Sequence, residues 1–373
     1  MSISTENALK LLEGAEAKIA RERAVVGLDG FVDSIIRIVD KRQADGTATH
    51  IEKISKWAER VDAAAGKSTK FELSVQQLKL GGNGPIMAHA LINFGLPLTC
   101  VGNMGFPDLH AIFQPMKKEC SVITVADASY TDAIEFEDGK IMLSRQDSAR
   151  DVTWETLQRV IGKEKLLALF DQATFIALNN WTALPGMSDI WRQMQAEICP
   201  KLSPLAAGRR RKIFFDIADP EFRLKEDVAM AMDLVGRFQK WFDVTLGLNQ
   251  KESEEVCEAL GISSVGTTRE DILKRAGLLQ AKLGVEGMVV HATKYAIAAS
   301  ATGSAIAEGP YDPRPVISTG AGDHFNAGYC LGFMLGGELE QRLQLGVSTS
   351  GYYVRTAKSP TIDNLRKFLQ EYS

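Results

Sequence analysis

The sequence predicts an α/β fold with three layers, in which helices cover both faces of a mostly parallel central sheet and a small β-lid stands beside it. Short apolar runs alternate with helical patterns along most of the 373 residues, and this alternation is typical of parallel strands joined by helices. Two stretches, about 34–80 and 128–146, interrupt the alternation and predict the lid. A hydrophobic content of 45% and a charged content of 24% agree with a folded globular chain.

Nine short apolar runs are the candidate strands of the central sheet. They are Ala24–Leu28, Leu98–Val101, Ser121–Val125, Thr174–Leu178, Lys212–Phe215, Phe242–Leu246, Gly287–His291, Ala296–Ser300 and Ala305–Ala307. The candidate helices have apolar residues three or four positions apart. They are Ile86–Phe94, Thr153–Phe170, Met187–Ile198, Phe222–Trp241, Gln250–Leu260, Arg269–Leu283 and a helix that begins near Asp323. An extra helix at about 5–21 precedes the first strand.

The lid is expected from strand-like pieces and one hairpin. Asp138-Gly139 lies in the middle of the strand-like stretch Ile134–Ile141, and Asp-Gly accepts the positive φ angles of a tight hairpin turn. The pieces Ser34–Val39 and Phe71–Leu78 flank a polar helix, Ile51–Ala65. No internal repeat or low-complexity linker divides the chain, so a single domain over residues 1–373 is expected.

Composition argues against several classes of function. The formal net charge of −4 disfavours binding of nucleic acid through bulk charge. Five cysteines at wide spacing, with no CxxC pair, disfavour a disulfide framework or a zinc site and favour a reducing compartment. The N-terminal residues lack the apolar segment of a signal peptide, and no apolar run approaches the roughly 18 residues of a membrane span. We therefore expect a cytoplasmic protein that binds neither nucleic acid nor membranes.

The clearest chemical signal is the segment Ser318–Gly328, in which small residues precede a helix that begins at an acid. Unpaired N–H groups and the positive end of the dipole at a helix start suit an anion such as phosphate. Glycines in such a segment let the backbone approach the ligand closely. Asp323 has two interpretations on these grounds: a helix cap, or a general base beside a phosphate-binding helix start.

This segment resembles the C-terminal signature of the ribokinase-like (PfkB) carbohydrate kinase family, D-T-x-G-A-G-D. Gly320–Asp323 matches the core of the signature, and Phe325 and Ala327-Gly328 match its usual continuation. Other similarities follow in the family's order and cover nearly the whole chain. They are Leu28–Asp33 with the acidic loop after the first strand, Gly81-Gly82-Asn83 with the glycine pair, Val101–Gly105 and Asp108 with V-G-x-x-G-x-D, and Asn249–Glu252 with N-x-x-E. The resemblance implies a ribokinase-like core.

The resemblance also implies ATP-dependent transfer of a γ-phosphoryl group to a hydroxymethyl group of a sugar or sugar-like substrate. Asp323 is then the general base, and the N–H groups around Gly320, Ala321 and Gly322 form an anion hole. The acceptor side comprises Asp29, Asp33, Gly81, Gly82 and Asn83. The ATP side comprises Asn249, Glu252, His291, Thr293 and Asn326. Glu252 would help to hold Mg²⁺ through water, although Asn249 and Glu252 are also typical of a helix capping box.

Several residues depart from the family pattern. Ile317 replaces the first Asp of the signature, which in relatives helps to form a monovalent-cation site. Pro85 or Ile86 stands near the usual Asn of the glycine motif, and His291–Tyr295 stands where a Gly-x-x-Gly turn often lies near the nucleotide. Asp216–Asp219 ends a strand and is a candidate for phosphate or metal binding. His324 is interpreted as structural or nucleotide-flanking rather than catalytic.

The sequence leaves the acceptor open among several sugars and nucleosides. Two alternatives to a sugar kinase are a nucleoside kinase of the same family and a catalytically weak regulator that binds a sugar or a nucleotide. Lids in this family can mediate dimers, so a homodimer through the hairpin around Asp138-Gly139 is a further prediction.

Overall fold

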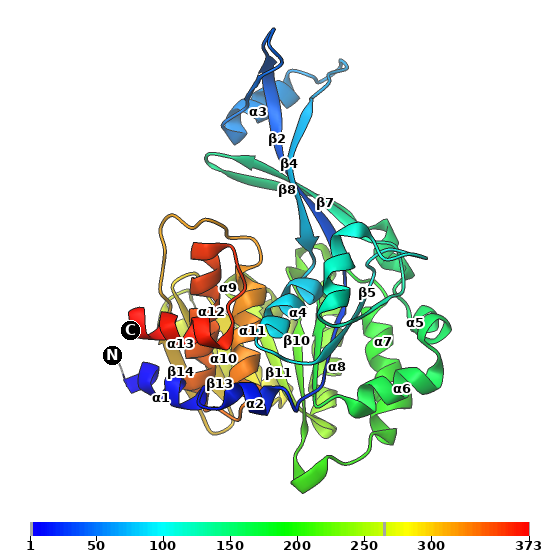
Figure 1. The fold of residues 1–373 in the computed structure, drawn as a ribbon, viewed down its shortest axis with the longest axis vertical. Coiled ribbons are helices and arrows are strands. Elements are labelled where there is room, and N and C mark those ends of the chain that lie inside the picture. The colour runs from blue at the N-terminus through cyan, green and yellow to red at the C-terminus, as the bar shows by residue number, and fades with distance from the viewer. Residues whose placement is uncertain (1–2, 264–265, 373) are drawn as a thin grey trace.

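A computed structural model describes residues 3–263 and 266–372, which form two sheets and their covering helices (Figure 1). The central sheet has nine strands in the order β14-β13-β12-β11-β10-β9-β1-β5-β6. They are β1 (Ala24–Leu28), β5 (Leu98–Gly102), β6 (Ser121–Thr124), β9 (Phe175–Asn179), β10 (Arg211–Asp216), β11 (Phe242–Asn249), β12 (Gly287–His291), β13 (Tyr295–Ser300) and β14 (Gly303–Glu308). The strands from β12 to β6 are parallel, and β13 and β14 extend the sheet in antiparallel orientation.

Helices cover both faces of this sheet, which confirms the predicted three-layer fold. Val25 and Ile213 point into one apolar core, whereas their neighbours Val26 and Phe214 point into the other. One face carries α5 (Trp154–Ile161), α6 (Lys163–Gln172), α7 (Met187–Gln193), α8 (Lys225–Arg237), α9 (Gln250–Ala259) and α10 (Arg269–Leu283). The other carries α1 (Ile3–Leu11), α2 (Ala15–Ile19), α4 (Asn83–Asn93), α11 (Ala321–Met334), α12 (Leu339–Thr356) and α13 (Ile362–Glu371). Burial on both faces explains why the strands are continuous apolar runs.

The order of the strands determines where a ligand can bind. From β1 the chain proceeds outward through β5 and β6 on one side, and then from β9 to β12 on the other. The direction of winding therefore reverses between β1 and β9. In open α/β sheets, ligands bind at the carboxyl ends of the strands beside such a switch point.

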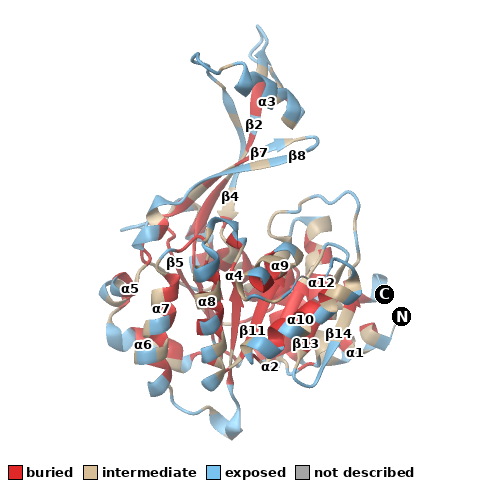
Figure 2. Cartoon of the chain, turned by 180° about the vertical axis from the view of Figure 1, so that it is seen from behind, coloured by how far each residue is buried: buried red, intermediate tan, exposed pale blue. Residues whose placement is uncertain are grey.

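The second sheet is the lid, which projects from the body of the molecule and is largely exposed at its outer end (Figures 1 and 2). Its elements are β2 (Phe31–Arg42), β3 (Ala48–His50), α3 (Ile54–Asp62), β4 (Leu73–Gly81), β7 (Ser129–Phe136) and β8 (Gly139–Arg145). A small apolar cluster that includes Ile38, Ile51 and Ile134 packs against Trp57 of α3. The hairpin of β7 and β8 turns at Asp138-Gly139, where the sequence places it.

The pairing register separates the lid sheet into two faces. Asp33 lies opposite Lys79 in β4 and Thr131 in β7, so these three side chains share one face. The register between β2 and β4 shifts after Ile35, where β4 has the extra residue Gln76. Such a bulge changes the alternation of a strand. The two faces matter because only one of them is turned toward the candidate site.

Some predicted elements differ from the structure. The single helix expected at about 5–21 is two short helices, because Gly14 between them has a left-handed φ of 64°. The helix expected over 153–170 is likewise divided at Gly162, which has a φ of 89°. The lid begins at Phe31 rather than at residue 34. Within the described ranges, no helix has the length and apolar character needed to cross a membrane.

Candidate active site

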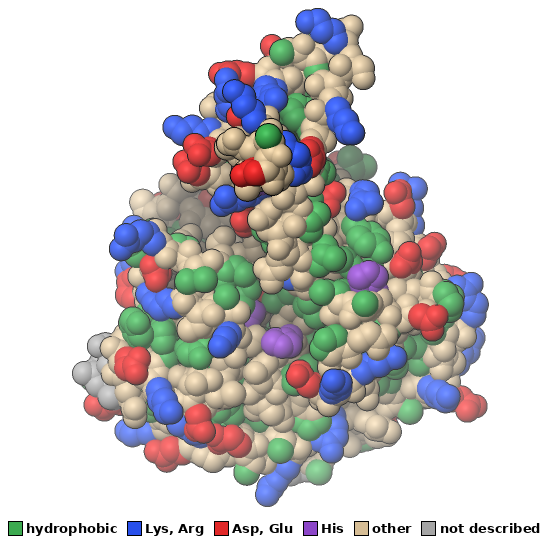
Figure 3. Space-filling model, turned by 45° about the horizontal axis from the view of Figure 1, so that its top comes forward, with side chains coloured by type: hydrophobic (Ala, Val, Ile, Leu, Met, Phe, Trp, Pro, Cys, Tyr) green, Lys and Arg blue, Asp and Glu red, His purple; other side chains and the backbone are tan. Residues whose placement is uncertain are grey.

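Two cavities lie at the carboxyl edge of the central sheet, on opposite sides of the loop that leads into α11. The larger, of about 650 Å³, is bounded by the inner face of the lid and includes Asp33, Gly320 and Asp323. The smaller, of about 470 Å³, includes Ser318, Gly322 and His291. Figure 3 shows the lid standing over this part of the molecule, with hydrophobic side chains around its base. One short segment thus contributes to both cavities.

Asp323 lies in the first turn of α11 and borders the larger cavity. Its side chain is 8% exposed, and its Oδ1 atom has no hydrogen-bond partner among the described residues. Burial raises the pKa of this carboxyl well above its usual range. The charges of Asp216 and Asp29 raise it further, whereas a hydrogen bond from the Asn83 side chain lowers it. A buried acid with a free oxygen at a cavity wall has the properties of a general base.

Gly320 is the N-cap of α11 and adopts a left-handed φ of 90°. A Cβ atom there would lie 3.3 Å from the Tyr353 hydroxyl and 3.3 Å from the Ile86 side chain. The position therefore favours glycine both for its positive φ and for the limited space. Two residues further along, a Cβ at Gly322 would lie 3.3 Å from the His291 ring. The helix start therefore presents backbone, rather than side chains, between the two cavities.

Asp33 is the acceptor-side acid that the structure places in the larger cavity. It is 6% exposed, and burial raises its pKa to about 6, with the charge of Lys79 acting in the opposite direction. Gly81 lies beside it: a Cβ at that position would be 2.3 Å from the Asp33 carboxyl, so a larger residue would displace the acid. Gly82 and Asn83 border the same cavity.

Asp29 lies elsewhere and is fully buried. Its carboxylate accepts hydrogen bonds from the backbone N–H of Asn83 at 2.9 Å and of Gly84 at 2.7 Å, and from Asn180 Nδ2 at 2.7 Å. It thus caps the N-terminus of α4 and is not among the residues that line either cavity. Three protein donors therefore occupy most of the roughly four acceptor positions of this carboxylate, and its role in direct acceptor binding stays a prediction.

The predicted nucleotide-side residues separate into two groups. Asn249, His291 and Thr293 line the smaller cavity. Burial lowers the pKa of His291 to about 4, so its ring is neutral near pH 7. Tyr295, Tyr311 and Phe325 give this cavity aromatic walls, which suit the flat face of a nucleotide base.

Glu252 and Asn326 do not line the smaller cavity. Glu252 and Asn249 form the capping box of α9: Glu252 N–H donates to Asn249 Oδ1 at 2.9 Å, and Glu252 Oε2 accepts from Asn249 N–H at 2.7 Å. Asn326 Nδ2 donates to Asp216 Oδ2 at 2.8 Å. Burial and the charge of Asp216 raise the pKa of Glu252 to about 8. Burial likewise raises the pKa of Asp216 to about 6. These residues form a buried acidic layer behind the cavity.

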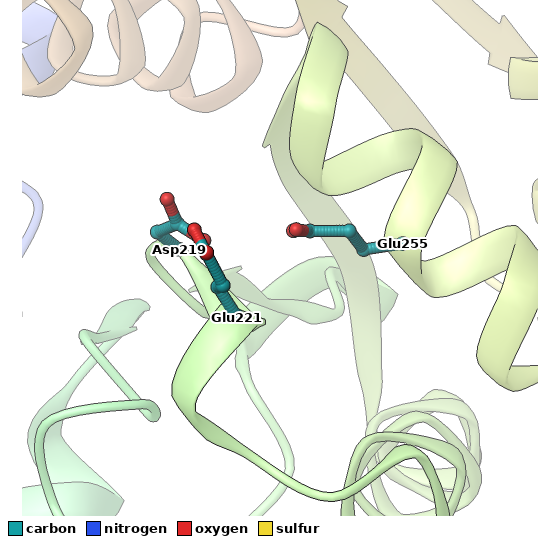
Figure 4. Close-up of side chains that lie close together, drawn as sticks. All are labelled: Asp219, Glu221 and Glu255. Atoms are coloured by element: carbon teal, nitrogen blue, oxygen red, sulfur yellow. The ribbon is translucent and has the colours of Figure 1, made fainter.

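Asp219, Glu221 and Glu255 lie close together (Figure 4). Lys251, at the edge of the smaller cavity, binds to this cluster. Its Nζ donates to Asp219 Oδ2 at 2.8 Å and to Glu221 Oε2 at 2.6 Å, and lies 3.5 Å from Glu255 Oε1. These hydrogen bonds raise the pKa of Lys251. The three acids are close enough to hold a metal ion, but the ammonium group of the chain already neutralises part of their charge.

Sequence reasoning missed several residues at the larger cavity. Asn180 has a left-handed φ of 59°, lines the cavity and holds Asp29. Its position directly after β9, at the carboxyl edge of a parallel sheet, was an available signal. Thr131 and Ser144 reach the cavity from the lid, and Lys140 of β8 contacts the Thr319 hydroxyl. These lid residues depend on strand register, which the sequence does not reveal.

The chain is similar over nearly its whole length to several known kinases. Residues 4–372 match a family model described as prokaryotic ketohexokinase. A ketohexokinase from Haloferax volcanii is 27% identical over 365 residues, which cover 96% of this chain and 94% of that protein. Among solved structures, a ribokinase from Arabidopsis thaliana in complex with ribose and ATP has a TM-score of 0.64 at 15% identity and 94% and 99% coverage of the two chains. Phosphofructokinase-2 from Escherichia coli has a TM-score of 0.63 at 14% identity, with the same coverage.

Proposed function

The chain belongs to the prokaryotic ketohexokinase family and is an ATP-dependent sugar kinase, and we propose that it phosphorylates a hydroxymethyl group of a ketohexose with Asp323 as the general base. The ketohexose acceptor is inferred from the family and from the relative in Haloferax volcanii. The assignment of Asp323 is inferred from its place in the structure.

The observation that carries this proposal is the position of one loop between two cavities. Ser318, Ala321 and Gly322 border the cavity with aromatic walls. Thr319, Gly320 and Asp323 border the cavity under the lid. A nucleotide in the first and a sugar in the second would therefore meet at the start of α11. Phosphoryl transfer depends mostly on such positioning and on electrostatic stabilisation of the transferred group.

In the proposed reaction, a hydroxymethyl oxygen of the acceptor attacks the γ-phosphorus of ATP. A new O–P bond forms, the bond between the γ-phosphorus and the bridging oxygen breaks, and ADP leaves. Asp323 takes the proton of the attacking hydroxyl, and the burial that raises its pKa makes it a stronger base than an exposed carboxylate. N–H groups at Gly320 and Gly322 stabilise the charge on the phosphoryl oxygens, whereas the Ala321 N–H donates to the Ser318 carbonyl at 3.2 Å and holds the loop in shape. Asp33 accepts hydrogen bonds from other hydroxyls of the sugar.

Mg²⁺ is the cation that we expect beside the phosphates. Asp216 and Glu252 supply carboxylate oxygens, which Mg²⁺ prefers, and burial raises the pKa of both acids. Asn326 Oδ1 has no partner among the described residues, so a further oxygen is available there. These residues fit a hydrated divalent cation, with Glu252 acting through water as the resemblance implies. When bound, the cation would neutralise charge on the phosphates.

A turnover assay separates the proposed function from its alternatives. ADP release is measured with purified protein, ATP and Mg²⁺ over a panel of ketohexoses, aldoses, sugar phosphates and nucleosides. The proposal expects the highest kcat/KM for a ketohexose and no burst of ADP without an acceptor. Faster turnover of a nucleoside would favour a nucleoside kinase. Ligand binding without turnover of any acceptor would favour a regulator and contradict the proposal.

We also infer a cytoplasmic location, where ATP is available. All five cysteines are free, with Cys100, Cys199, Cys257 and Cys330 buried. Free buried thiols are usual in a reducing compartment. Partial permeabilisation of cells followed by assay of the kinase activity in each fraction tests this inference.

A further inference from the structure

We propose that Tyr353 and His324 are positioning residues that orient the anion hole, and that Ser359 and His89 continue the same hydrogen-bond chain. The inference rests on the proposed function, because it concerns the N–H groups expected to stabilise the transferred phosphoryl group. Neither Tyr353 nor His324 is among the residues that line the two cavities. Both act through the loop that separates them.

Two carbonyl groups of this loop are held by side chains. The Tyr353 hydroxyl donates to the Thr319 carbonyl at 3.0 Å. The Gly320 carbonyl lies 2.7 Å from His324 Nδ1 and also accepts the His324 backbone N–H at 3.1 Å. A carbonyl oxygen only accepts hydrogen bonds, so His324 Nδ1 must carry a proton. The Tyr353 and His324 rings stack on each other with centroids 3.6 Å apart and an interplanar angle of 13°.

Holding a carbonyl determines where the next N–H group points. In a trans peptide, the C=O of one residue and the N–H of the next point in opposite directions within one plane. Tyr353 therefore orients the N–H of Gly320, and His324 fixes the peptide plane between Gly320 and Ala321, which directly precedes the N–H of Gly322. The Ala321 N–H also donates to the Ser318 carbonyl at 3.2 Å, so its peptide plane is held from both ends.

Gly320 is where such support is needed most. Its φ of 90° lies in a region that glycine enters easily, and the same freedom lets the adjoining peptide planes rotate at little energetic cost. A loop with one preferred arrangement of N–H groups stabilises a transition state better than a loop that must reorganise. The two side chains supply the rigidity that Gly320 lacks.

The proton on His324 Nδ1 determines the direction of the remaining hydrogen bonds. Burial lowers the pKa of His324 to about 4, so the ring is neutral and its Nε2 accepts. Ser359 Oγ lies 2.8 Å from that atom and donates its single proton to it. Ser359 Oγ then accepts from His89 Nδ1 at 3.0 Å. These hydrogen bonds connect His89 in α4 to the anion hole. Each donor among them has one acceptor within the series.

The test uses variants that remove one feature at a time. Tyr353→Phe removes only the hydroxyl. His324→Phe keeps a ring that can stack on Tyr353 but has no donor for the Gly320 carbonyl. His324→Asn has a donor at the place of Nδ1 but no ring. Tyr352→Phe is the matched control, since Tyr352 packs edge-on against Phe368 rather than against the loop.

We expect Tyr353→Phe and His324→Phe to lower kcat by roughly 10- to 100-fold, because small displacements of catalytic groups have effects of that order. KM for the sugar should stay within about twofold, since neither replaced side chain lines the cavity proposed for the sugar. His324→Asn should restore most of kcat, and Ser359→Ala should lower it by less than the two phenylalanine variants. A change confined to the melting temperature, or an equal loss in His324→Asn and His324→Phe, would overturn the proposal.

A binding measurement separates this proposal from the proposed function. Thermal shift is recorded with Mg²⁺ and ADP, and then with Mg²⁺, ADP and fluoroaluminate, which mimics a phosphoryl group in transfer. Parent protein should gain an additional rise in melting temperature from fluoroaluminate. Tyr353→Phe and His324→Phe should keep the rise in melting temperature that ADP causes and lose the further rise that fluoroaluminate causes. If both variants keep the further rise in melting temperature with fluoroaluminate, the positioning role is contradicted, whatever sugar the enzyme uses.

Discussion

At the residue scale, the catalytic role proposed for Asp323 comes with a cost in stability. Its folded-state pKa is raised, mainly by burial, whereas in the unfolded chain it returns to an ordinary value near 3.9. The folded state therefore binds this proton more tightly, and the free energy of unfolding falls as pH rises from the unfolded pKa toward the folded one. Near neutral pH the residue is a destabilising acid, which the proposed reaction would nevertheless require.

Replacing Asp323 with Asn should separate the two effects. We expect Asp323→Asn to lower kcat by about 10²- to 10⁴-fold, because the base is lost. The melting temperature should rise by about 1–3 °C, because a neutral amide is cheaper to bury than an ionised acid. Calorimetry and an ADP-release assay measure both. Near-normal turnover would contradict the role of the base, and circular dichroism serves to show that the fold is intact.

The pH dependence of kcat/KM should reflect the same raised pKa. A general base must be deprotonated, so the rate should rise with pH through the pKa of Asp323, well above the range of an exposed carboxyl. The charge of Asp33 contributes to that elevation. Asp33→Asn should therefore move the acidic limb of the profile to lower pH while raising KM for the sugar. If the acidic limb of the profile lies at the same pH in the parent protein and in Asp33→Asn, the two carboxyl groups do not interact.

The residues that the sequence could identify are those whose role depends on local pattern. The Gly320–Asp323 segment predicts a helix start with an acid in its first turn, and Asp323 lies in the first turn of α11. Asp29 and Asp33 have the same pattern, being acids after a buried strand, but the structure gives Asp29 three protein donors and leaves Asp33 at the cavity. That difference depends on where α4 packs, which no local pattern encodes.

At the element scale, α9 begins with a capping box that also borders the proposed metal site. Asn249→Ala removes the cap, and we expect it to lower the free energy of unfolding by about 1 kcal/mol. Glu252→Gln should raise the Mg²⁺ concentration for half-maximal activity about tenfold, which is the usual effect of losing a group that supports a metal. Urea denaturation without Mg²⁺ and a Mg²⁺ titration of turnover measure the two effects.

The capping box of α10 is a matched control. Thr268 N–H and Asp271 N–H exchange hydrogen bonds with each other's side chains as in α9, at 3.0 and 3.2 Å. Thr268→Ala should produce the same loss of stability as Asn249→Ala with no change in the Mg²⁺ titration. If Glu252→Gln behaves like Thr268→Ala, the acid serves only as a cap and Mg²⁺ is held elsewhere.

The bounds of an element were predictable where its pattern of apolar residues reflects a single environment, such as a fully buried strand or a helix with one buried face. The strands β1 and β12 and the helix α10 have the predicted bounds because they are short apolar or amphipathic units with clear ends. The helices α12 and α13 were not predicted. Gly346 in α12 shows why: its missing side chain makes room for the Phe325 ring, 2.7 Å from where a Cβ would lie. Packing against α11 favours a residue that helix propensity disfavours.

At the scale of the whole molecule, the lid joins the site to the exterior of the protein. Its inner face carries Asp33, Thr131 and Ser144 to the larger cavity. Its outer face carries Leu78 and Leu143 in the row that crosses Ser34 and Asp132. The sequence predicted a lid from two interruptions in the α/β alternation. It could not predict which residues face inward, because the bulge at Gln76 shifts the pattern within β4.

The outer face gives the predicted homodimer a physical basis. Leu73, Val75, Leu78 and Leu143 are each about half exposed, at 48%, 54%, 54% and 48%. A second copy of this chain would cover them by placing its own lid face against them, because a two-fold axis brings identical apolar surfaces together. We expect a dimer by light scattering at micromolar concentration. Leu78→Asp combined with Leu143→Asp should give a monomer.

Gln77→Asp is the control for the introduced charge, since Gln77 lies opposite Ile35 on the other face of the lid. It should leave the dimer intact. A parent protein that is monomeric at every concentration, or a double variant that stays dimeric, would contradict the lid interface. If the dimer forms as expected, the monomeric variant should also have a higher KM for the sugar. The face that holds Asp33 belongs to the same thin sheet, and a partner on its outer side would restrict the movement of its inner side.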